Sequence, residues 1–243
     1  MYTPVKVFVV VPAFNEAARL PRVLETMPRE VDHVIVVDDA STDATSRVAK
    51  DVLVVRHETN RGVGASIASG YRKALSMPGE PNDAFVVMAG DGQMDPRDLP
   101  ALVAPIRNNQ AGYVKGNRFA HETVRDMPFA RRAGVGIFSI LTSAAIGQRV
   151  HDSQCGFTAI SRAACALIDL DSLWPRFGYP NDLLGMVARA GVTIAERPVA
   201  ALYPHKRNHL KARHVPTIAA VTLRAWWRRV SAASRSGPTE GTK

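Results

Sequence analysis

The segment VKVFVVVPAFNEAARLPRVLETM, residues 5–27, contains the smallest unit from which the fold can be predicted. Its first part, residues 5–11, consists mostly of β-branched and aromatic residues, a pattern typical of a strand covered on both faces. Its second part, residues 17–27, places leucine, valine and methionine at helical spacing. The segment therefore predicts a buried strand followed by a helix.

The same alternation recurs along the first half of the chain. Strands are expected at residues 33–37, 52–55 and 84–89, and helices at residues 42–50, 63–75 and 96–106. This order indicates an α/β fold with a mainly parallel central sheet flanked by helices. The polar clusters PAFNE, DDAS, NRGVGA and GDGQMD each follow an expected strand. Ligands bind beyond the carboxyl ends of strands in such sheets, so these loops are predicted to form the site.

The second half is less regular, with one long helix expected over residues 129–146. The clusters HDSQCGFTAISR and YPNDLLG are expected to complete the site. We predict one catalytic domain over residues 1–205 and a basic amphipathic segment over residues 206–230. The stretch 231–243 is small, polar and without an apolar anchor, which predicts a disordered tail.

The formal charge of +9 is concentrated near the C-terminus. Residues 1–196 hold 21 basic and 21 acidic residues, whereas residues 197–243 hold ten basic residues and one acid. Within that stretch, apolar residues and two tryptophans alternate with arginines; they are Val215, Ile218, Val221, Leu223, Arg224, Trp226, Trp227, Arg228 and Arg229. Such a helix is suited to an anionic membrane surface. The alternatives are a helix packed on the catalytic domain and a solvated basic face.

The composition, 46% hydrophobic and 22% charged, excludes a disordered chain and a polytopic membrane protein. The longest stretch without a charge, residues 133–148, is too short and too rich in Gly and Ser for a transmembrane helix. Cys155 and Cys165 lack the spacing of a disulfide framework or a thiolate zinc site. We therefore expect a cytoplasmic protein that binds membranes peripherally.

Three carboxylates, Asp38, Asp39 and Asp43, lie where a buried strand emerges into a loop. Helix capping by Asp39 or Ser41 explains one of these polar side chains but leaves the other carboxylates unexplained. Carboxylates only accept hydrogen bonds, so ribose hydroxyls or a base N–H are suitable partners. The cluster therefore predicts part of a nucleoside site.

A second group of oxygen ligands lies in the loop GDGQMDP. Asp91, Gln93 and Asp95 alternate there, and such groups bind Mg²⁺ or Mn²⁺ together with substrate phosphates. The alternative is a plain turn in which Asp95 precedes Pro96 at a helix start. Arginines 118, 131 and 132 are candidates to offset diphosphate charge, although each taken singly also suits an ordinary surface arginine.

Taken together, the loops PAFNE, VDDASTD, NRGVGA and GDGQMDP resemble those of family 2 glycosyltransferases of the GT-A fold. The chain is most similar to the polyprenyl-phosphate, or dolichyl-phosphate, mannosyl- and glucosyltransferases. The resemblance covers roughly residues 5–205 and includes the motifs GNR and DSQCGF. It implies a single GT-A domain that binds a nucleotide diphosphate sugar.

The resemblance also implies roles for individual residues. The positions that match the nucleotide-sugar site are Pro12, Phe14, Asn15, Glu16, Asp38, Asp39, Asp91, Gln93 and Arg118. Asp91 and Gln93 match the metal positions, and Asp182 matches an acidic residue that faces the acceptor. The stretch 203–211, which contains Lys206 and Arg207, matches a basic loop that closes over the phosphates of donor and acceptor. Arg131 is added to these phosphate ligands on the chemistry of its side chain. Relatives commonly read Asp-Ala-Asp-Gly-Gln where this chain begins with Ala89, so one metal-facing carboxylate is absent.

These assignments predict an inverting enzyme that moves a hexose from a UDP- or GDP-sugar to a polyprenyl phosphate. Asp91, through Mg²⁺ or Mn²⁺, and Arg118 are expected to stabilise the leaving diphosphate. Transfer to a soluble or protein-bound hydroxyl is the alternative, and Asp182 is then the candidate base. A non-catalytic nucleotide- or nucleic-acid-binding module is a third reading, but its acidic loops repel phosphate unless a metal intervenes.

Overall fold

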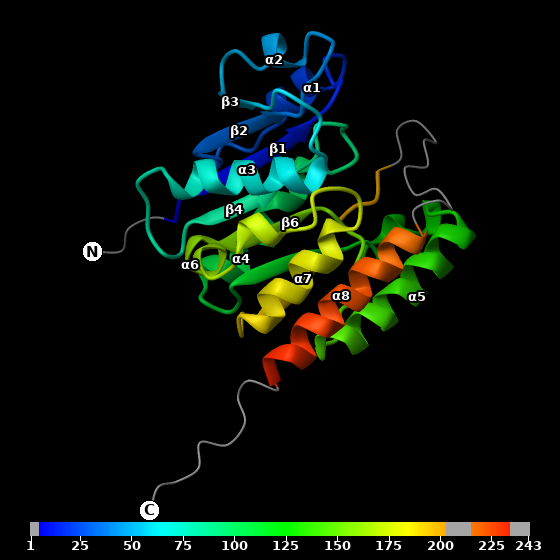
Figure 1. Ribbon diagram of the computed structural model, residues 1–243. Helices are drawn as coiled ribbons and strands as arrows, with labels where there is room; N and C mark the ends of the chain where they lie inside the picture. Colours follow the sequence, from blue (N-terminus) through cyan, green and yellow to red (C-terminus); the bar gives the residue numbers. More distant parts are fainter. Residues whose placement is uncertain (1–4, 203–214, 234–243) are drawn as a thin grey trace, which may run out of the picture.

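A computed structural model describes residues 5–202 and 215–233 of the chain. A seven-stranded sheet forms its centre (Figure 1). The strands are β1 (Val7–Ala13), β2 (His33–Asp38), β3 (Leu53–Arg56), β4 (Ala84–Val87), β5 (Tyr113–Asn117), β6 (Thr158–Ser161) and β7 (Ile194–Pro198). They lie in the order β3-β2-β1-β4-β6-β5-β7. Only β6 runs antiparallel to its neighbours among the described strands, which confirms the mainly parallel α/β sheet.

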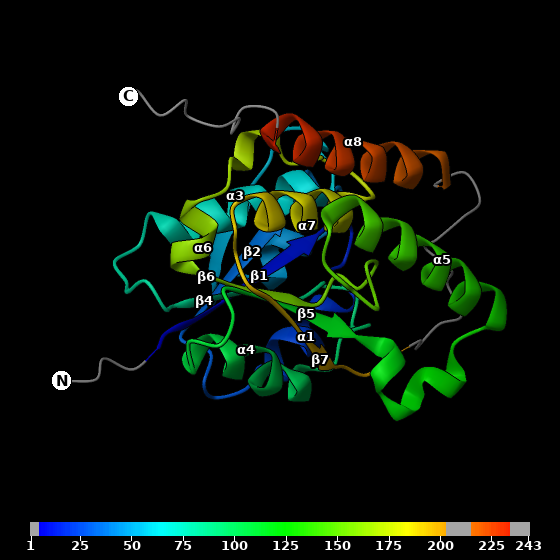
Figure 2. The same cartoon turned by 90° about the horizontal axis from the view of Figure 1, so that it is seen from below.

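Helices cover both faces of this sheet. They are α1 (Leu20–Glu25), α2 (Thr45–Val48), α3 (Val63–Leu75), α4 (Leu99–Arg107), α5 (Phe129–Ile146), α6 (Arg162–Ala166), α7 (Tyr179–Arg189) and α8 (Val215–Ala233). Figure 2 shows α3, α6 and α7 on one side of the sheet and α1 and α4 on the other. Short 3₁₀ turns occur at Pro96–Asp98, Arg118–Ala120, Glu122–Asp126 and Leu170–Ser172.

The sheet separates two hydrophobic cores, because successive side chains of a strand point to opposite faces. From β1, Phe8 and Val10 enter the core beneath α3 and α7, where they meet Tyr71 and Leu183. Val7, Val9, Val11 and Ala13 enter the core beneath α1 and α4. Every residue of β1 is buried, as its uninterrupted apolar run predicts.

The expected helices over residues 63–75 and 129–146 coincide with α3 and α5. The helix expected over residues 42–50 is only α2, and Ser41 does not cap it. Instead, the Ser41 hydroxyl accepts a hydrogen bond from the Asn15 amide at 2.9 Å, which ties the loop after β2 to the loop after β1. Asp95 does begin the 3₁₀ turn at Pro96, since its side chain accepts from the Arg97 amide.

The C-terminal helix α8 lies alongside α7 and α5 (Figures 1 and 2). Its inner face buries Ile218, Val221 and Ala225, so this face of the amphipathic segment packs on the domain. The buried amide of Asn181 donates to Thr142 of α5 at 2.9 Å and to Thr222 of α8 at 3.0 Å. A polar contact therefore fixes the three helices relative to one another. The helix also includes residues 231–233, at the start of the stretch predicted to be disordered, whereas residues 234–243 lie outside the described part.

Helix α5 differs from the sequence-based expectation for membrane spans. The uncharged stretch 133–148 is expected to be too short for a transmembrane helix. By length and composition, however, the whole of α5 is long and apolar enough to cross a membrane. Its inner face is bonded to the domain, because Ser139 accepts from the Ser153 amide at 2.9 Å in addition to the Thr142 contact. These bonds place α5 along the surface of the domain.

Close packing of α3 on the sheet leads to a prediction for Gly70. A Cβ atom at this position lies only 2.2 Å from Cγ1 of Val10 in the middle of β1. We expect Gly70→Ala to destabilise the fold by about 1–3 kcal/mol, because the buried strand cannot move away from the added methyl group. Urea denaturation followed by circular dichroism measures this loss.

The control is Gly134→Ala in α5, where the added Cβ meets nothing within 4 Å. Alanine is the better helix former, so this variant is expected to unfold at the parental urea concentration or slightly above it. Equal midpoints for the two variants contradict the close packing of α3 on β1.

Candidate active site

Loops at the carboxyl ends of β1, β2 and β4 surround a pocket of about 590 Å³, which we call the central pocket. The residues that line it are Pro12, Ala13, Phe14, Glu16, Asp39, Asn60, Gly62, Val63, Ser66, Ala89, Gly90, Asp91, Trp174, Arg176, Phe177 and Thr217. Five of the predicted nucleotide-sugar residues lie there together: Pro12, Phe14, Glu16, Asp39 and Asp91. The pocket therefore forms where the polar clusters predicted it.

Asp39 is 3% exposed and is held by three donors. Its Oδ1 faces Nδ1 of His57 at 2.7 Å and accepts from the Arg61 amide at 2.9 Å, while Oδ2 accepts from the Gly62 amide at 2.7 Å. The other ring nitrogen of His57 lies 2.9 Å from the Ser69 hydroxyl. A carboxylate has about four acceptor positions, so one position on Oδ2 of Asp39 receives no hydrogen bond from the residues that the structure describes.

The two glycines of NRGVGA allow the backbone of residues 174–175 to approach the start of α3 closely. Gly62 has φ of +97°, and a Cβ there lies 2.6 Å from the carbonyl oxygen of Pro175. A Cβ on Gly64 lies 2.0 Å from the carbonyl oxygen of Trp174. The Ala65 amide donates to the Pro175 carbonyl at 3.0 Å. The start of α3 is thus occupied by Asp39 and by residues 174–175.

Asp38 and Asn15 match nucleotide-site positions in the resemblance, but the structure does not place them at the pocket. The fully buried Asp38 accepts from the Ser41 amide at 2.8 Å and from the hydroxyl of Ser46. Burial acts to raise the pKa of Asp38, but these bonds and the Arg56 charge lower it. The exposed Asn15, with φ of 54°, accepts from the Thr42 amide at 2.9 Å. Both residues shape the loops that carry their neighbours.

The remaining residues after β1 do reach the central pocket. Phe14 is 46% exposed there, so its ring is available to a planar ligand. Glu16 is half-buried and forms an ion pair with Arg19 in the turn before α1. Its amide donates to the Thr45 hydroxyl at 2.9 Å, which fixes this turn against α2.

Asp91 lines the central pocket from the loop that follows β4 and is half-buried. Its Oδ1 accepts from the Gln93 amide at 3.0 Å, and no other partner contacts its carboxylate within residues 5–202 and 215–233. Gln93 contributes that amide but is not among the residues that line the pocket. Within the same ranges, no group of three His, Cys, Asp or Glu side chains is arranged to hold a metal. One carboxylate suits Mg²⁺ or Mn²⁺ only when substrate phosphates supply further ligands.

A second pocket of about 780 Å³ adjoins Asp91 on its other side. Arg19, Arg22 and Arg97 line it, together with Leu202 at the edge of the described chain. Arg97 is engaged with Asp95, to which it donates at 2.6 Å. These arginines add positive charge near the loop where a diphosphate is expected.

Arg118 is held in a buried ion pair with Asp152 of the DSQCGF motif. Its Nε and Nη2 donate to the Asp152 carboxylate at 2.7 and 2.8 Å, and its side chain is 12% exposed. Burial acts to raise the pKa of Asp152, but Arg118 and the fully buried Lys115 lower it. Arg118 is not among the residues that line either pocket. Its predicted phosphate role stays a prediction.

Asp182 is fully buried between α7 and α8 and does not line either pocket. Its Oδ2 accepts from the Trp174 amide at 2.8 Å, and its Oδ1 lies 3.4 Å from Arg228 and 3.8 Å from Arg224. Burial raises the pKa of Asp182 against the opposing effects of both arginines and the Trp174 amide. This placement favours a structural role for Asp182 over the predicted role as a base.

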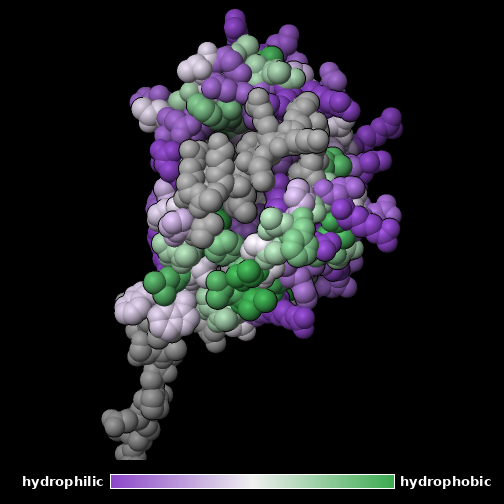
Figure 3. All heavy atoms as spheres, turned by 90° about the vertical axis from the view of Figure 1, so that its right-hand side faces the viewer, coloured by the Kyte–Doolittle hydropathy of each residue, from purple (hydrophilic) through white to green (hydrophobic). Residues whose placement is uncertain are grey.

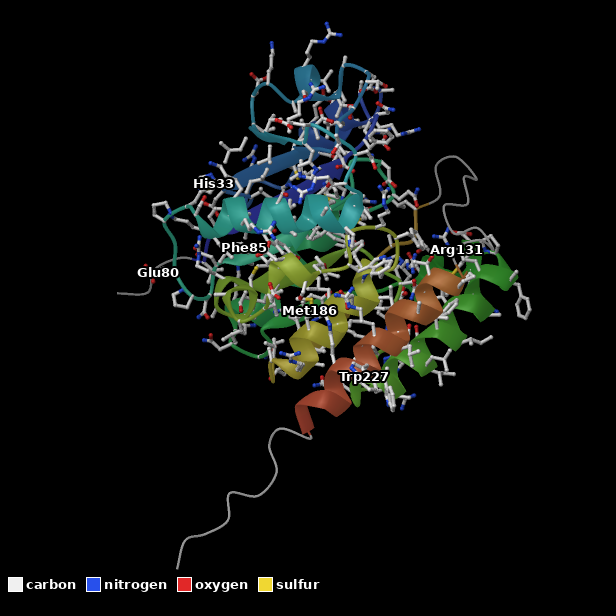
Figure 4. The ribbon with its side chains drawn as sticks, viewed as in Figure 1. His33, Glu80, Phe85, Arg131, Met186 and Trp227 are labelled. Atoms are coloured by element: carbon white, nitrogen blue, oxygen red, sulfur yellow. The ribbon has the colours of Figure 1, made fainter. Side chains whose placement is uncertain are left out.

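The remaining predicted phosphate ligands lie away from the central pocket or outside the described residues. Arg131 is half-buried in the first turn of α5, at the end of the helix pair where α8 begins (Figure 4). Lys206 and Arg207, with the whole predicted loop 203–211, lie outside the described residues.

Sequence reasoning missed the pocket wall formed by residues 172–177, which we call the wall segment. Trp174, Arg176 and Phe177 line the central pocket from this segment, and Thr217 joins them from the first turn of α8. Arg176 lies against the start of α3, where it donates to the Asn60 carbonyl at 3.3 Å. The signal in the sequence was the pair of glycines in NRGVGA, which mark a close approach of another chain segment.

Comparison with known proteins identifies the family of the chain and supports its fold. Residues 8–168 match the profile of Glycosyl transferase family 2. An undecaprenyl-phosphate mannosyltransferase from Micrococcus luteus is 30% identical over 80% of this chain and 82% of its own length. A UDP-N-acetylglucosamine–dolichyl-phosphate N-acetylglucosaminyltransferase from Methanococcus voltae is 27% identical over 81% of this chain and 86% of its own.

Among solved structures, glucosyl-3-phosphoglycerate synthase from Mycobacterium tuberculosis, in complex with Mn²⁺, UDP and phosphoglyceric acid, superposes with a TM-score of 0.66. It is 22% identical and covers 97% of this chain and 80% of its own, which confirms the GT-A fold. The profile match covers more than half of the chain and includes most of the residues that line the central pocket. The chain belongs to glycosyl transferase family 2.

Proposed function

We propose that this protein transfers a hexose from a nucleotide diphosphate sugar to a polyprenyl phosphate at a membrane surface, with inversion at the anomeric carbon. The observation that carries the acceptor is the course of α8. Thr217 in its first turn lines the central pocket, while Leu223, Trp226 and Trp227 farther along the same helix are exposed. One helix therefore connects the pocket to an apolar surface.

That surface, which we call the apolar face, consists of exposed side chains of α5 and α8. Its members are Phe129, Ile137, Ile140, Leu141, Leu223, Trp226 and Trp227, which are 42–76% exposed. Figure 3 shows hydrophobic side chains gathered on the side of the molecule where α5 lies, and Figure 4 shows Trp227 on α8 beside α5. The exposed Arg132 and Arg149 lie near the two ends of α5, where anionic headgroups would meet them.

The donor assignment rests on the two ends of the central pocket. Asp39 has one acceptor position left for a ribose hydroxyl or a base N–H, and Asp91 is available for a metal shared with the diphosphate. Relatives whose names specify dolichyl phosphate and undecaprenyl phosphate support the lipid acceptor.

The chemistry is a direct displacement at the anomeric carbon. An oxygen of the acceptor phosphate forms a bond to that carbon while the bond to the donor's β-phosphate oxygen breaks, and the nucleoside diphosphate leaves from the opposite face. A divalent ion, when bound, supplies Lewis-acid stabilisation of the departing diphosphate. A phosphate acceptor is already anionic near neutral pH, so the reaction needs no base in the pocket, in agreement with the buried position of Asp182.

A soluble hydroxyl acceptor is the competing function. The structural neighbour bound to phosphoglyceric acid favours it, because that ligand is a small soluble molecule. A hydroxyl requires a base close to the anomeric carbon, and the predicted candidate Asp182 is enclosed by Trp174, Arg224 and Arg228. The described residues therefore favour the phosphate acceptor.

The deciding experiment is a donor and acceptor screen with the full chain and Mn²⁺. Radiolabelled UDP-glucose, UDP-N-acetylglucosamine and GDP-mannose are each incubated with polyprenyl phosphate in vesicles, or with phosphoglyceric acid and other soluble hydroxyl compounds. We expect label from one donor to enter the organic phase as a sugar phospholipid. Label that enters only water-soluble product contradicts the proposal.

Membrane binding through the apolar face gives a separate prediction. The full chain is expected to sediment with vesicles containing anionic lipid more than with neutral vesicles, and to be released as salt rises through the screening range. Removing α8 is a poor test because Ile218, Val221 and Ala225 belong to the core. We instead expect the double variant Ile137→Ser/Ile140→Ser to lose about tenfold in vesicle affinity, since two exposed side chains lose their burial in the headgroup region.

The matched control removes similar apolar area elsewhere. Leu53 and Val54 are 37% and 39% exposed on the edge strand β3, far across the sheet from α5. The variant Leu53→Ser/Val54→Ser is expected to bind vesicles as the parent does. Equal losses in both double variants contradict a specific role for the apolar face.

A further inference from the structure

We infer that Asp182 is a positioning residue that, with Arg224 and Arg228, fastens the wall segment of the central pocket to α8. Nucleotide affinity then depends on the docking of α8, which is remote in sequence from the loops after β1, β2 and β4. This inference deepens the proposed function and rests on it, because it takes the central pocket to be the nucleotide-sugar site.

The wall segment contacts α3 on one side and Asp182 with α8 on the other. On the side toward α3, its backbone at Trp174 and Pro175 packs directly on Gly62 and Gly64 at the start of that helix. The Ala65 amide donates to the Pro175 carbonyl there at 3.0 Å. The wall segment thus covers the part of α3 whose Gly62 amide holds Asp39, so the position of the wall bears on the nucleoside end of the pocket.

On the other side of the wall segment, the contacts come from Asp182 and α8. The Asp182 carboxylate accepts from the Trp174 amide at 2.8 Å. Arg224 and Arg228 each donate to the Ser172 carbonyl, at 2.8 and 2.9 Å. The Arg224 guanidinium also lies 5.9 Å from the centre of the Trp174 ring, within cation–π range. Ser172 and Trp174, in the first half of the wall segment, are therefore bonded to the same three charged side chains.

The charges of this cluster depend on one another. The Asp182 Oδ1 atom is buried and accepts no hydrogen bond from the described residues, so its compensation comes from Arg228 at 3.4 Å and Arg224 at 3.8 Å. Without that carboxylate, two arginines face each other beside the wall. A buried charge that loses its partner is strongly unfavourable, so removing Asp182 is expected to displace the arginines and release the wall.

Close packing of α7 and α8 makes this linkage stiff. A Cβ on Gly185 lies 2.7 Å from Cβ of Ala225, so the two helices meet with almost no space between their backbones. Asn181 bonds Thr222 of α8, which lies two residues before Arg224. A change at the cluster therefore reaches the wall segment, because α8 and α7 offer it little room to relax.

The test measures nucleotide binding by calorimetry with Mn²⁺ and UDP or GDP, whichever the unaltered chain binds. The variants are Asp182→Asn, Arg224→Gln and their combination, with Arg107→Gln as control because Arg107 pairs with Glu30 far from the pocket. We expect Asp182→Asn and Arg224→Gln each to weaken nucleotide binding by about tenfold, and the combination to be little weaker than either, because both remove the same linkage. The control is expected to bind as the parent does.

A second readout follows the wall itself. The chain has three tryptophans, so Trp226→Phe/Trp227→Phe leaves Trp174 as the only one. In that background, acrylamide is expected to quench Trp174 more strongly after Arg224→Gln, and Arg224→Lys is expected to restore part of the protection. Arg224 is 38% exposed at its side chain, so its variants remain informative if Asp182→Asn does not fold.

The outcomes separate the possibilities. Lower melting temperatures with unchanged nucleotide affinity and unchanged Trp174 quenching overturn the inference and leave a purely structural cluster. Loss of turnover in Asp182→Asn with parental nucleotide affinity, and normal turnover in Arg224→Gln, identifies Asp182 as a base and also overturns it. Failure of the unaltered chain to bind any nucleotide contradicts the proposed function instead.

Discussion

Asp91→Ala is expected to lower kcat/KM for sugar transfer by about 10²–10³-fold, the usual effect of removing one group that stabilises charge in the transition state. Asp91 is the only carboxylate of the GDGQMD loop that lines the central pocket, and the neighbouring Ala89 offers no ligand group. In the proposed reaction, the departing diphosphate would then lose the divalent ion that Asp91 would help to hold. Initial rates with and without Mn²⁺ measure the effect.

Metal affinity gives the same prediction an independent readout. A single carboxylate is a weak site, so calorimetry is expected to detect tight Mn²⁺ binding only when nucleoside diphosphate is present. Ala89→Asp adds a second carboxylate beside Asp91 and is expected to tighten Mn²⁺ binding to the free protein. Asp51→Ala removes an exposed carboxylate beside β3 and serves as control. Tight Mn²⁺ binding to the free protein that is unchanged in Asp91→Ala contradicts the prediction that Asp91 is a metal ligand.

The order of strands and helices could be predicted because each element carries its own pattern. The apolar run of β1 and the helical spacing of α3 and α5 are local properties, and the structure places these elements where the patterns do. The same local reading put polar clusters at strand ends. Parallel strands bring such ends together, and the structure accordingly places Asp39 and Asp91 in the lining of one pocket.

Orientation could not be predicted in the same way. Asp38 and Asp39 are adjacent, and successive side chains of a strand point to opposite sides. The sequence does not say which of the two faces the ligand, and the structure turns Asp39 to the pocket and Asp38 to Ser41 and Ser46. The resemblance marked both residues as parts of the same site.

Long-range partners account for the other differences. Arg118 meets Asp152, and Asp182 meets Arg224 and Arg228, through contacts between segments distant in sequence. Each charged residue looks available to a ligand until its partner is placed beside it. The wall segment could not be predicted because Trp174 and Phe177 look like ordinary core residues in the sequence. Only the fold places them beside α3 and α8, where they line the pocket.

Asp39→Ala is expected to weaken nucleotide binding by about 1–3 kcal/mol, the cost of leaving a buried donor of the ligand without its acceptor. The variant also leaves His57 and the amides of Arg61 and Gly62 without the carboxylate that they contact. Those donors are partly buried at the start of α3, so some stability is lost as well. Calorimetric titration with nucleotide, at a temperature where circular dichroism shows both proteins folded, separates binding from folding.

The control for this prediction perturbs the same buried cluster without touching the ligand position. Ser69→Ala removes the hydroxyl at 2.9 Å from the far nitrogen of His57 and leaves the contact between His57 and Asp39 in place. We expect it to lower the melting temperature slightly and to keep parental nucleotide affinity, since the free position on the Asp39 Oδ2 atom is unchanged. If Asp39→Ala binds nucleotide as well as Ser69→Ala does, the carboxylate only joins the loop after β2 to α3. The nucleoside then lies elsewhere in the central pocket, with Phe14 and the wall segment as its remaining contacts.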